Sequence, residues 1–209
     1  MSVDFKRKDK ELYLPKTTPS IVDVPQMMFV RVDGKGDPNA SKEYAAAVEL
    51  LYGLSYSIKM GNKAILQYVV PPLEGLWRVE DDFRGGGATI SDKSKFVWTM
   101  MIRQPDFVSE EIFEVAKDTL AKKKPNLDIS KAKLESMTEG LCVQVMHIGS
   151  YDEEPATVGA LDKFAMDKGY AIDIGDERHH HEIYISDPRK VAPEKLKTVI
   201  RHPIRRLIP

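Results

Sequence analysis

The chain carries one order of secondary-structure signals twice, and this repetition constrains its fold more than any other feature. The first copy has strand, helix, strand and strand patterns at 27–32, 41–59, 64–70 and 96–103. The second copy repeats that order at 141–147, 152–168, 170–174 and 181–186. Each copy is followed by a further helical pattern, beginning near Ser109 and near Pro193. Repeated order of this kind predicts two copies of one structural unit.

Short segments of the two copies can be laid on each other. Met101–Pro105 matches Tyr184–Pro188, and Val108–Glu111 matches Val191–Glu194. Two strand–helix–strand–strand units can join their strands into one antiparallel sheet with the helices on one face. The sequence therefore predicts an α+β fold of two tandem modules.

The predicted domain covers residues 21–205, with one module at about 25–124 and the other at about 140–205. Residues 1–20 are predicted to form a polar lead-in with one short strand at 11–14. Ser109 and Asp152 are good N-cap residues for helices. Gly85–Gly87 lacks the context of a phosphate-binding loop and is typical of a flexible linker.

The composition excludes several classes of protein. The 209 residues carry 31 basic and 32 acidic side chains, so no strongly basic face is predicted and nucleic acid is not an expected direct partner. The single cysteine, Cys142, cannot form an intrachain disulfide, which fits a cytoplasmic location. No apolar run approaches the length of a membrane span, and the N-terminus lacks the apolar region of a signal peptide.

The segment Pro71–Trp77 is the most unusual local feature. It follows the strand pattern at 64–70, and its two prolines end that strand because proline has no N–H to donate. Glu74 and Trp77 then lie on one stiff turn, before a short strand at 77–79. A carboxylate beside a large indole is typical of the lip of a ligand pocket. The competing interpretation is a surface glutamate in a turn and a tryptophan in the core.

Three segments carry a resemblance to a known family: Pro71–Trp77, the turn Gly34–Pro38 and the strand Glu182–Pro188. On these segments the chain resembles a stand-alone member of the GyrI-like small-molecule-binding family over residues 20–205. The resemblance implies tandem modules with a ligand cleft between them. It also implies bulky, flat, often cationic ligands that meet a glutamate inside the cleft.

Members of this family serve as effector-sensing domains of multidrug-responsive transcription activators or as free-standing bacterial proteins. Some free-standing members are similar to hydrolases that open the cyclopropane ring of DNA-alkylating compounds. The resemblance therefore implies a bacterial protein that binds aromatic small molecules, needs no cofactor and detoxifies them by hydrolysis. Two alternatives stay open, a non-catalytic module that sequesters or senses drugs and a protein that inhibits DNA gyrase. The sequence does not fix the oligomeric state.

Glu182 is the first candidate for the glutamate that contacts the ligand. In a strand, Glu182 shares one face with Tyr184, whereas His181 and Ile183 share the other. We expect the isoleucine face to pack on the helices, which turns Glu182 and Tyr184 toward a cleft. The competing interpretation is the ordinary wet face of an antiparallel sheet.

The resemblance also implies roles for these groups. Glu182 or Glu74 would position or deprotonate the attacking water, and Tyr184 would hydrogen-bond the ligand carbonyl where negative charge grows. The predicted ligand-binding residues are Tyr68, Leu73, Trp77, Thr99 and Met101. Core packing is the competing interpretation for most of them.

Two further assignments depend on local pattern. Aligning Trp98 with His181 predicts Trp98 in the core and places Thr99 and Met101 on the face of Glu182. The run His179–His181 is not predicted to bind a metal, because no acidic or cysteine partner has ligand spacing to it.

Overall fold

A computed structural model of the chain describes residues 2–80 and 92–207 and has an α+β fold. The first module contains, in chain order, β1 (Ser20–Lys35), α3 (Lys42–Gly61), β2 (Leu73–Val79), β3 (Phe96–Gln104) and α4 (Glu110–Lys123). The second contains β4 (Ala132–Ile148), α5 (Glu154–Asp167), β5 (Tyr170–Ile172), β6 (His180–Tyr184) and β7 (Lys197–Arg206). Two short helices precede them, α1 (Phe5–Lys8) and α2 (Lys10–Tyr13). Short 3₁₀ turns lie at η1 (Lys93–Lys95), η2 (Ile129–Lys131), η3 (Tyr151–Glu153) and η4 (Pro193–Lys195). The predicted linker Gly85–Gly87 lies outside the described residues.

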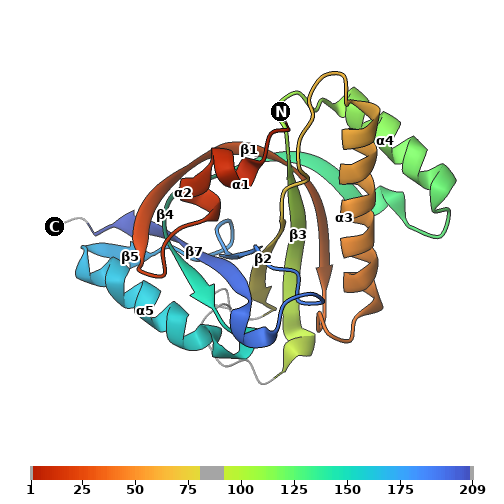
Figure 1. Cartoon of the computed structure of the whole chain (residues 1–209). Coiled ribbons are helices and arrows are strands. Elements are labelled where there is room, and N and C mark those ends of the chain that lie inside the picture. The colour runs from red at the N-terminus through yellow and green to blue at the C-terminus, as the bar shows by residue number, and fades with distance from the viewer. Residues whose placement is uncertain (1, 81–91, 208–209) are drawn as a thin grey trace.

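The strands form one seven-stranded antiparallel sheet in the order β4-β1-β3-β2-β6-β7-β5, and β4 also pairs with β7. This extra pairing closes a ring, so the sheet curves into a barrel (Figure 1). The two modules are placed alike in the ring, because β1 pairs with β3 as β4 pairs with β7. In the same way, β3 pairs with β2 as β7 pairs with β6. The predicted architecture of tandem strand–helix–strand–strand modules is therefore confirmed.

Both long strands, β1 and β4, are irregular at the same place. Their ladder passes from the pair Val24 and Gly140 to the pair Gln26 and Thr138, which leaves Pro25 unpaired. A proline suits this position because it has no N–H for the ladder. Gly140 has a φ of +66°, a left-handed conformation that side chains with a Cβ rarely adopt. Such irregularities increase local bending and twist, which a closed sheet requires.

The long helices pack on the outer face of the ring (Figure 1). α3 lies against β1 and β3 with α4 beside it, and α5 lies against β4. The hydroxyls of Ser41 and Ser109 cap α3 and α4 by accepting the N–H groups of Tyr44 and Ile112, which confirms the predicted N-cap at Ser109. Within the described part of the chain, no helix is both long and apolar enough to cross a membrane.

The interior of the ring is closed by the N-terminal segment. Leu12 and Tyr13 of α2 are buried in one apolar cluster with Phe29, Met101 and Ile183. Figure 1 shows α1 and α2 lying across the inside of the curved sheet. The strand predicted at 11–14 is wrong. Adjacent residues of a strand point to opposite faces, whereas a helical turn can bury two neighbours together.

The interpretation of Pro71–Trp77 as a turn after a strand is also wrong. Residues 64–70 do not form a strand, and only Tyr68 makes an isolated bridge, to Val3. The two prolines instead precede β2, which begins at Leu73 and pairs with β3 and β6. Prolines without a donor can border a strand at either end, so the pattern alone did not show which side carried the ladder.

The helix predicted from Pro193 toward Pro203 is wrong as well. Only the turn η4 forms there, and Pro203 lies within β7, opposite Cys142. The alignment of the two copies was shifted for the same reason. By its pairing, β3 corresponds to β7, whereas the sequence match had laid it on β6.

The second-module helix begins differently from the prediction. Ser150, rather than Asp152, caps the first turn through a capping box with Glu153. The α-helix proper then starts at Glu154.

Candidate functional site

A cluster of aromatic and acidic side chains lies on the outer face of β2 and β6, where the two modules meet. Gly75 pairs with Glu182 and Trp77 with His180 across this ladder, so these side chains share one face. A Cβ on Gly75 would lie 2.7 Å from Nε1 of Trp77 and 3.2 Å from the hydroxyl oxygen of Tyr184. The glycine therefore leaves room for the indole and the phenol to meet above it.

Tyrosines from the flanking elements complete the cluster. The ring centroid of Tyr44 in α3 lies 6.1 Å from that of Trp77, and the ring of Tyr151 in η3 lies 6.0 Å from that of Tyr184. Trp77 is only 6% exposed, whereas Tyr151 is 40% exposed. Tyr151 is therefore the most exposed member of this aromatic cluster, since Tyr44 and Tyr184 are half-buried.

Hydrogen bonds order the polar groups of the cluster. Nε1 of Trp77 donates to the hydroxyl of Tyr184 over 2.9 Å, and that hydroxyl donates to Oε2 of Glu182 over 2.7 Å. Oε1 of Glu182 lies 2.9 Å from Nε2 of His180. Both oxygens of Glu182 are therefore held in place, and the side chain is only 15% exposed.

A second carboxyl group, Glu154, approaches Glu182 from the start of α5. Burial, the charge of Glu182 and a hydrogen bond with it raise the pKa of Glu154 to about 10. Burial also acts to raise the pKa of Glu182, but hydrogen bonds and charge from His180 and a hydrogen bond from Tyr184 outweigh it and lower the pKa. The two groups thus differ in state, with a neutral acid beside an ionised carboxylate, an arrangement used for acid–base chemistry.

The same corner of the site could hold a metal ion. Ligand atoms of Glu154, His180 and Glu182 all lie within 4.8 Å of one another. The prediction that the histidine run has no acidic partner was therefore wrong about the surroundings of His180. Spacing in the sequence could not reveal Glu154, because it comes from a different element of the second module.

Sequence reasoning also missed the two tyrosines and Glu154 as members of this site. Tyr44 lies within the helix predicted at 41–59, where an aromatic residue is ordinarily explained by core packing, and Tyr151 lies in a turn. A glutamate in the first turn of a helix is ordinarily explained by the helix dipole. The one signal available was an aromatic residue, Tyr151, just before the helix predicted at 152–168.

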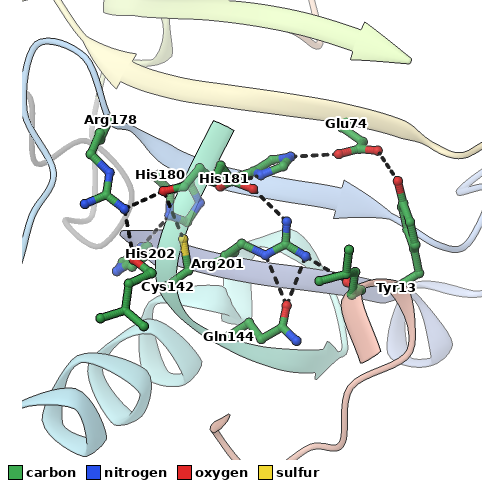
Figure 2. A network of polar contacts seen from close by, with 12 residues as sticks. Tyr13, Glu74, Cys142, Gln144, Arg178, His180, His181, Arg201 and His202 are labelled. Carbon is green, nitrogen blue, oxygen red and sulfur yellow. Dashed lines mark hydrogen bonds and ion pairs between the residues drawn. The ribbon is translucent and has the colours of Figure 1, made fainter. Parts of the chain in front are cut away.

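Glu74 lies elsewhere, in a polar network inside the ring (Figure 2). The hydroxyl of Tyr13 donates to Oε1 of Glu74 over 3.2 Å, and Nε2 of His181 lies 3.1 Å from Oε2. Glu139 stands on the other side of His181, with Oε1 2.9 Å from Nδ1. Glu139 also accepts a hydrogen bond from Nη1 of Arg201 over 2.7 Å.

Electrostatics suit a structural role for this network. Burial acts to lower the pKa of His181, but Glu139 and Glu74 outweigh it and raise the pKa to about 9. Burial acts to raise the pKa of Glu139, and the charges of His181 and Arg201 reverse this and lower it to about 2. His181 and Glu74 are fully buried. The network holds compensated charges and ties α2, through Tyr13, to the strands.

The other predicted ligand-binding residues do not gather at one site, because some lie on the outer face of the sheet, some on the inner face and one lies apart. Leu73 lies on the face of Trp77 and packs against the outer core. Met101 is buried inside the ring, and Thr99 donates to Oδ1 of Asp33 over 2.6 Å. Tyr68 is buried against Phe5, away from both clusters.

The predicted faces of β3 and β6 need correction. Trp98 is in the outer core as predicted. Trp77 pairs with Trp98 on one side and with His180 on the other, so Trp98 shares the face of His180 and not that of His181. Thr99 and Met101 therefore point away from Glu182. The expectation that Ile183 faces the long helices was also wrong, because Ile183 lies inside the ring with α2.

A groove of about 690 Å³ lies between α3 and α4. Its lining is largely apolar and includes Tyr56, Met60, Ile112 and Val115. None of the predicted site residues lines it. We assign the candidate site to the outer face of β2 and β6, because the titratable groups and aromatic rings gather there.

Comparisons with known proteins agree with the fold. The family model described as GyrI-like small molecule binding domain matches residues 17–205. A search of curated proteins found no match to the chain.

Solved structures give close similarities. An uncharacterised conserved protein from Listeria innocua is 45% identical, with a TM-score of 0.91, and the match covers 98% of this chain and 100% of that one. A hydrolase from Listeria innocua is 44% identical, with a TM-score of 0.87 and the same coverage. The EcmrR C-terminal domain is 13% identical with a TM-score of 0.55, covering 91% of this chain and 98% of that one, and shares the fold alone.

Proposed function

The chain belongs to the GyrI-like small-molecule-binding family, and we propose that it binds flat aromatic compounds at the outer face of β2 and β6. There Trp77, Tyr44 and Tyr151 supply aromatic surface, and Tyr184 and Glu182 supply polar contacts. Aromatic rings around one ionised carboxylate favour bulky aromatic ligands, cationic ones above all. Because Tyr151 is the exposed member of the cluster, a ligand enters by displacing its ring.

We further propose that the bound compound is hydrolysed at a strained cyclopropane ring. The observation that carries this proposal is the pairing of ionised Glu182 with neutral Glu154. The similarity at 44% identity to a protein described as a hydrolase supports it. Glu74 is set aside because it is fully buried inside the ring, where Tyr13 donates to Oε1 and Nε2 of His181 lies 3.1 Å from Oε2.

The chemistry follows from the two carboxyl groups. Glu182 takes a proton from water as the water oxygen forms a bond to a cyclopropane carbon. The ring C–C bond breaks, and its electron pair passes through the conjugated ligand to a carbonyl oxygen. Glu154 gives its proton to that oxygen, so the product contains the elements of one water molecule. Tyr184 positions Glu182 through the hydrogen bond it already makes.

The test is incubation with a cyclopropane-bearing DNA alkylator followed by mass spectrometry. The proposal expects a mass gain of one water, reduced about a hundredfold or more in Glu182→Gln. Glu135→Gln is the matched control, because Glu135 is an exposed residue of β4 paired with Arg31. If the compound binds but its mass stays unchanged, the proposed hydrolysis is wrong and the protein sequesters the compound instead. Full turnover by Glu182→Gln would overturn the role of Glu182.

A further inference from the structure

Three side chains from α5 and β6 converge at one corner of the candidate site. One ligand atom each from Glu154, His180 and Glu182 lies within 4.8 Å of the other two, and Nε2 of His180 lies 2.9 Å from Oε1 of Glu182. The corner is shielded from solvent, because Glu154 is 7% exposed and His180 is 1% exposed. Ligand atoms around a tetrahedral zinc ion stand about 3.4 Å apart, so a small opening of this corner accommodates one ion.

Glu154 carries a buried oxygen without a partner. Among the described residues, none hydrogen-bonds Oε1 of Glu154, although this atom is shielded from solvent. A polar atom buried without a partner costs free energy, and a bound ion is one established explanation for such an atom. The convergence of three side chains and the unpartnered oxygen are separate observations, and both indicate a cation.

The groups behind the corner resemble the outer contacts of a metal site. Nδ1 of His180 lies 2.7 Å from Nε2 of His202, and Nδ1 of His202 lies 2.6 Å from Oδ1 of Asp162. Figure 2 shows the two imidazole rings beside each other. A metal-bound histidine ordinarily donates its other ring N–H to a partner of this kind, which fixes the ring for the ion. With an ion at Nε2 of His180, the single N–H of each neutral imidazole supplies the hydrogen for one of these two contacts.

We propose that Glu154, His180 and Glu182 bind one divalent transition-metal ion of the zinc class. One imidazole nitrogen with two carboxylate oxygens is a donor set that suits zinc, whereas magnesium and calcium prefer oxygen alone. The two carboxylates balance the charge of the ion, as a buried cation requires. Three protein ligands leave a fourth position, which water or an atom of a bound compound fills in sites of this kind.

Metal binding and the proposed hydrolysis exclude each other. The hydrolysis uses Glu182 as the base and Glu154 as the acid, and an ion held by both carboxylates occupies the electron pairs that these roles require. The ion is therefore an inhibitor of the site and not a cofactor of the reaction. Its binding goes beyond the proposed function and does not depend on it, and only the loss of turnover rests on that function.

Titration with zinc alone tests the site in protein first treated with a chelator. Calorimetry should show one ion per chain, and cobalt in place of zinc should give the visible absorption of a four-coordinate ion. We expect Glu154→Gln and His180→Gln each to weaken zinc binding by about a hundredfold. His179→Gln and Asp152→Asn are the matched controls, because His179 is adjacent in the histidine run and Asp152 lies just before α5 with its side chain 88% exposed. Equal zinc affinity in all four variants, or no stoichiometric zinc, would overturn the proposal.

A further variant keeps the test decisive where a substitution of a buried ligand unfolds the chain. Asp162 contacts His202 and is not itself a ligand, and its side chain is 31% exposed. Asp162→Asn should therefore fold and bind zinc about tenfold more weakly. Zinc should raise the Tm of the natural chain more than that of Asp162→Asn. Equal shifts of Tm in the two proteins would overturn the proposal.

Turnover provides the remaining measurement. With the cyclopropane-bearing alkylator, zinc should reduce the rate in proportion to the sites it fills, and a chelator should restore the rate. Full turnover by zinc-loaded protein would overturn the inhibition. Lack of turnover by the metal-free chain would count against the proposed hydrolysis alone, because the titration with zinc uses no alkylator.

Discussion

Glu74 and Glu182 lie in adjacent register positions of two paired strands and point to opposite faces of the sheet. Glu182 stands opposite Gly75, so its side chain shares a face with Trp77, and the neighbouring Glu74 points into the ring. The interior carboxylate is held by Tyr13 and approached by His181. The outer carboxylate is held by His180 and Tyr184 beneath aromatic rings. The ladder of β2 and β6 thus carries Glu74, with a structural role, on its inner face and Glu182, the candidate functional residue, on its outer face.

Substitution of the two glutamates should separate stability from function. Glu74→Gln leaves protonated His181 with one carboxylate fewer in a buried site, and we expect it to lower the free energy of unfolding by about 3 kcal/mol. Glu182→Gln should change stability by less than about 1 kcal/mol, because the amide oxygen of glutamine can still accept the hydrogen bond from Tyr184. Urea unfolding of both variants at neutral pH measures the difference. Equal destabilisation by the two substitutions would contradict this division.

The buried acid Glu154 should make stability depend on pH. Its pKa rises from 4.5 to about 10 on folding, so above pH 4.5 the unfolded chain loses a proton that the folded chain keeps. Stability from this group is therefore complete below pH 4.5 and is lost as pH rises toward 10. Glu154→Gln cannot ionise, so its stability relative to the natural chain should increase with pH, by up to about 1.4 kcal/mol per unit.

Unfolding of the two proteins at about pH 5 and about pH 8 checks this expectation. Glu135→Gln serves again as the control, because Glu135 is exposed and its variant should track the natural chain. A stability difference between Glu154→Gln and the natural chain that stays constant with pH would show that Glu154 ionises normally when folded.

The sequence was sufficient for elements whose patterns are local. The helices from Ser41 and Ser109 show their caps and apolar stripes directly, and β3 is rich in aromatic and methionine residues. Tandem order followed from the repeat. The parity of Glu182 and Tyr184 on β6 followed from the two-residue period of a strand.

The errors arise where tertiary pairing decides the outcome. Pro71–Trp77 contains turn-forming residues, yet β2 is paired on both sides, and Gly75 serves close packing instead of a turn. β7 contains Pro203 and charged residues, which favour a helix or a loop in the sequence. It forms a strand because it pairs with β4 and because Arg201 donates a hydrogen bond to Glu139 inside the ring. Which face of β6 meets the helices depends on how the sheet closes into a barrel. The local periodicity of the sequence does not indicate that closure.

The ion pairs of His181 should limit stability in both alkaline and acidic solution. The pKa of His181 rises from 6.5 to about 9 on folding, so its contribution is complete below pH 6.5 and is lost as pH rises through 9. The pKa of Glu139 falls from 4.5 to about 2, so its contribution is present above pH 4.5 and is lost as pH falls toward 2. In Glu139→Gln the acid-side loss should diminish, and the imidazole of His181 should titrate at lower pH.

Histidine resonances recorded across the pH range test this prediction in the natural chain and in Glu139→Gln. The signal of His147 provides an internal reference, because its ring nitrogens contact Thr157 and Ser150 and not Glu139. A His181 signal that titrates at the same pH in both proteins would mean that Glu139 does not hold its proton.

Two glycine substitutions should have opposite effects. In Gly75→Ala the new Cβ would meet Nε1 of Trp77 at 2.7 Å and Sδ of Met100 at 3.1 Å, so the aromatic cluster must spread. We expect a loss of about 1–3 kcal/mol in stability and weaker binding of aromatic cations, measured by quenching of tryptophan fluorescence. Gly159, in the middle of α5, has no atom within 4 Å of its Cβ position. Gly159→Ala should therefore add about 0.5–1 kcal/mol through helix propensity and leave binding unchanged. Undiminished binding by Gly75→Ala would mean that ligands do not use the space above β2, and the site would have to be sought elsewhere.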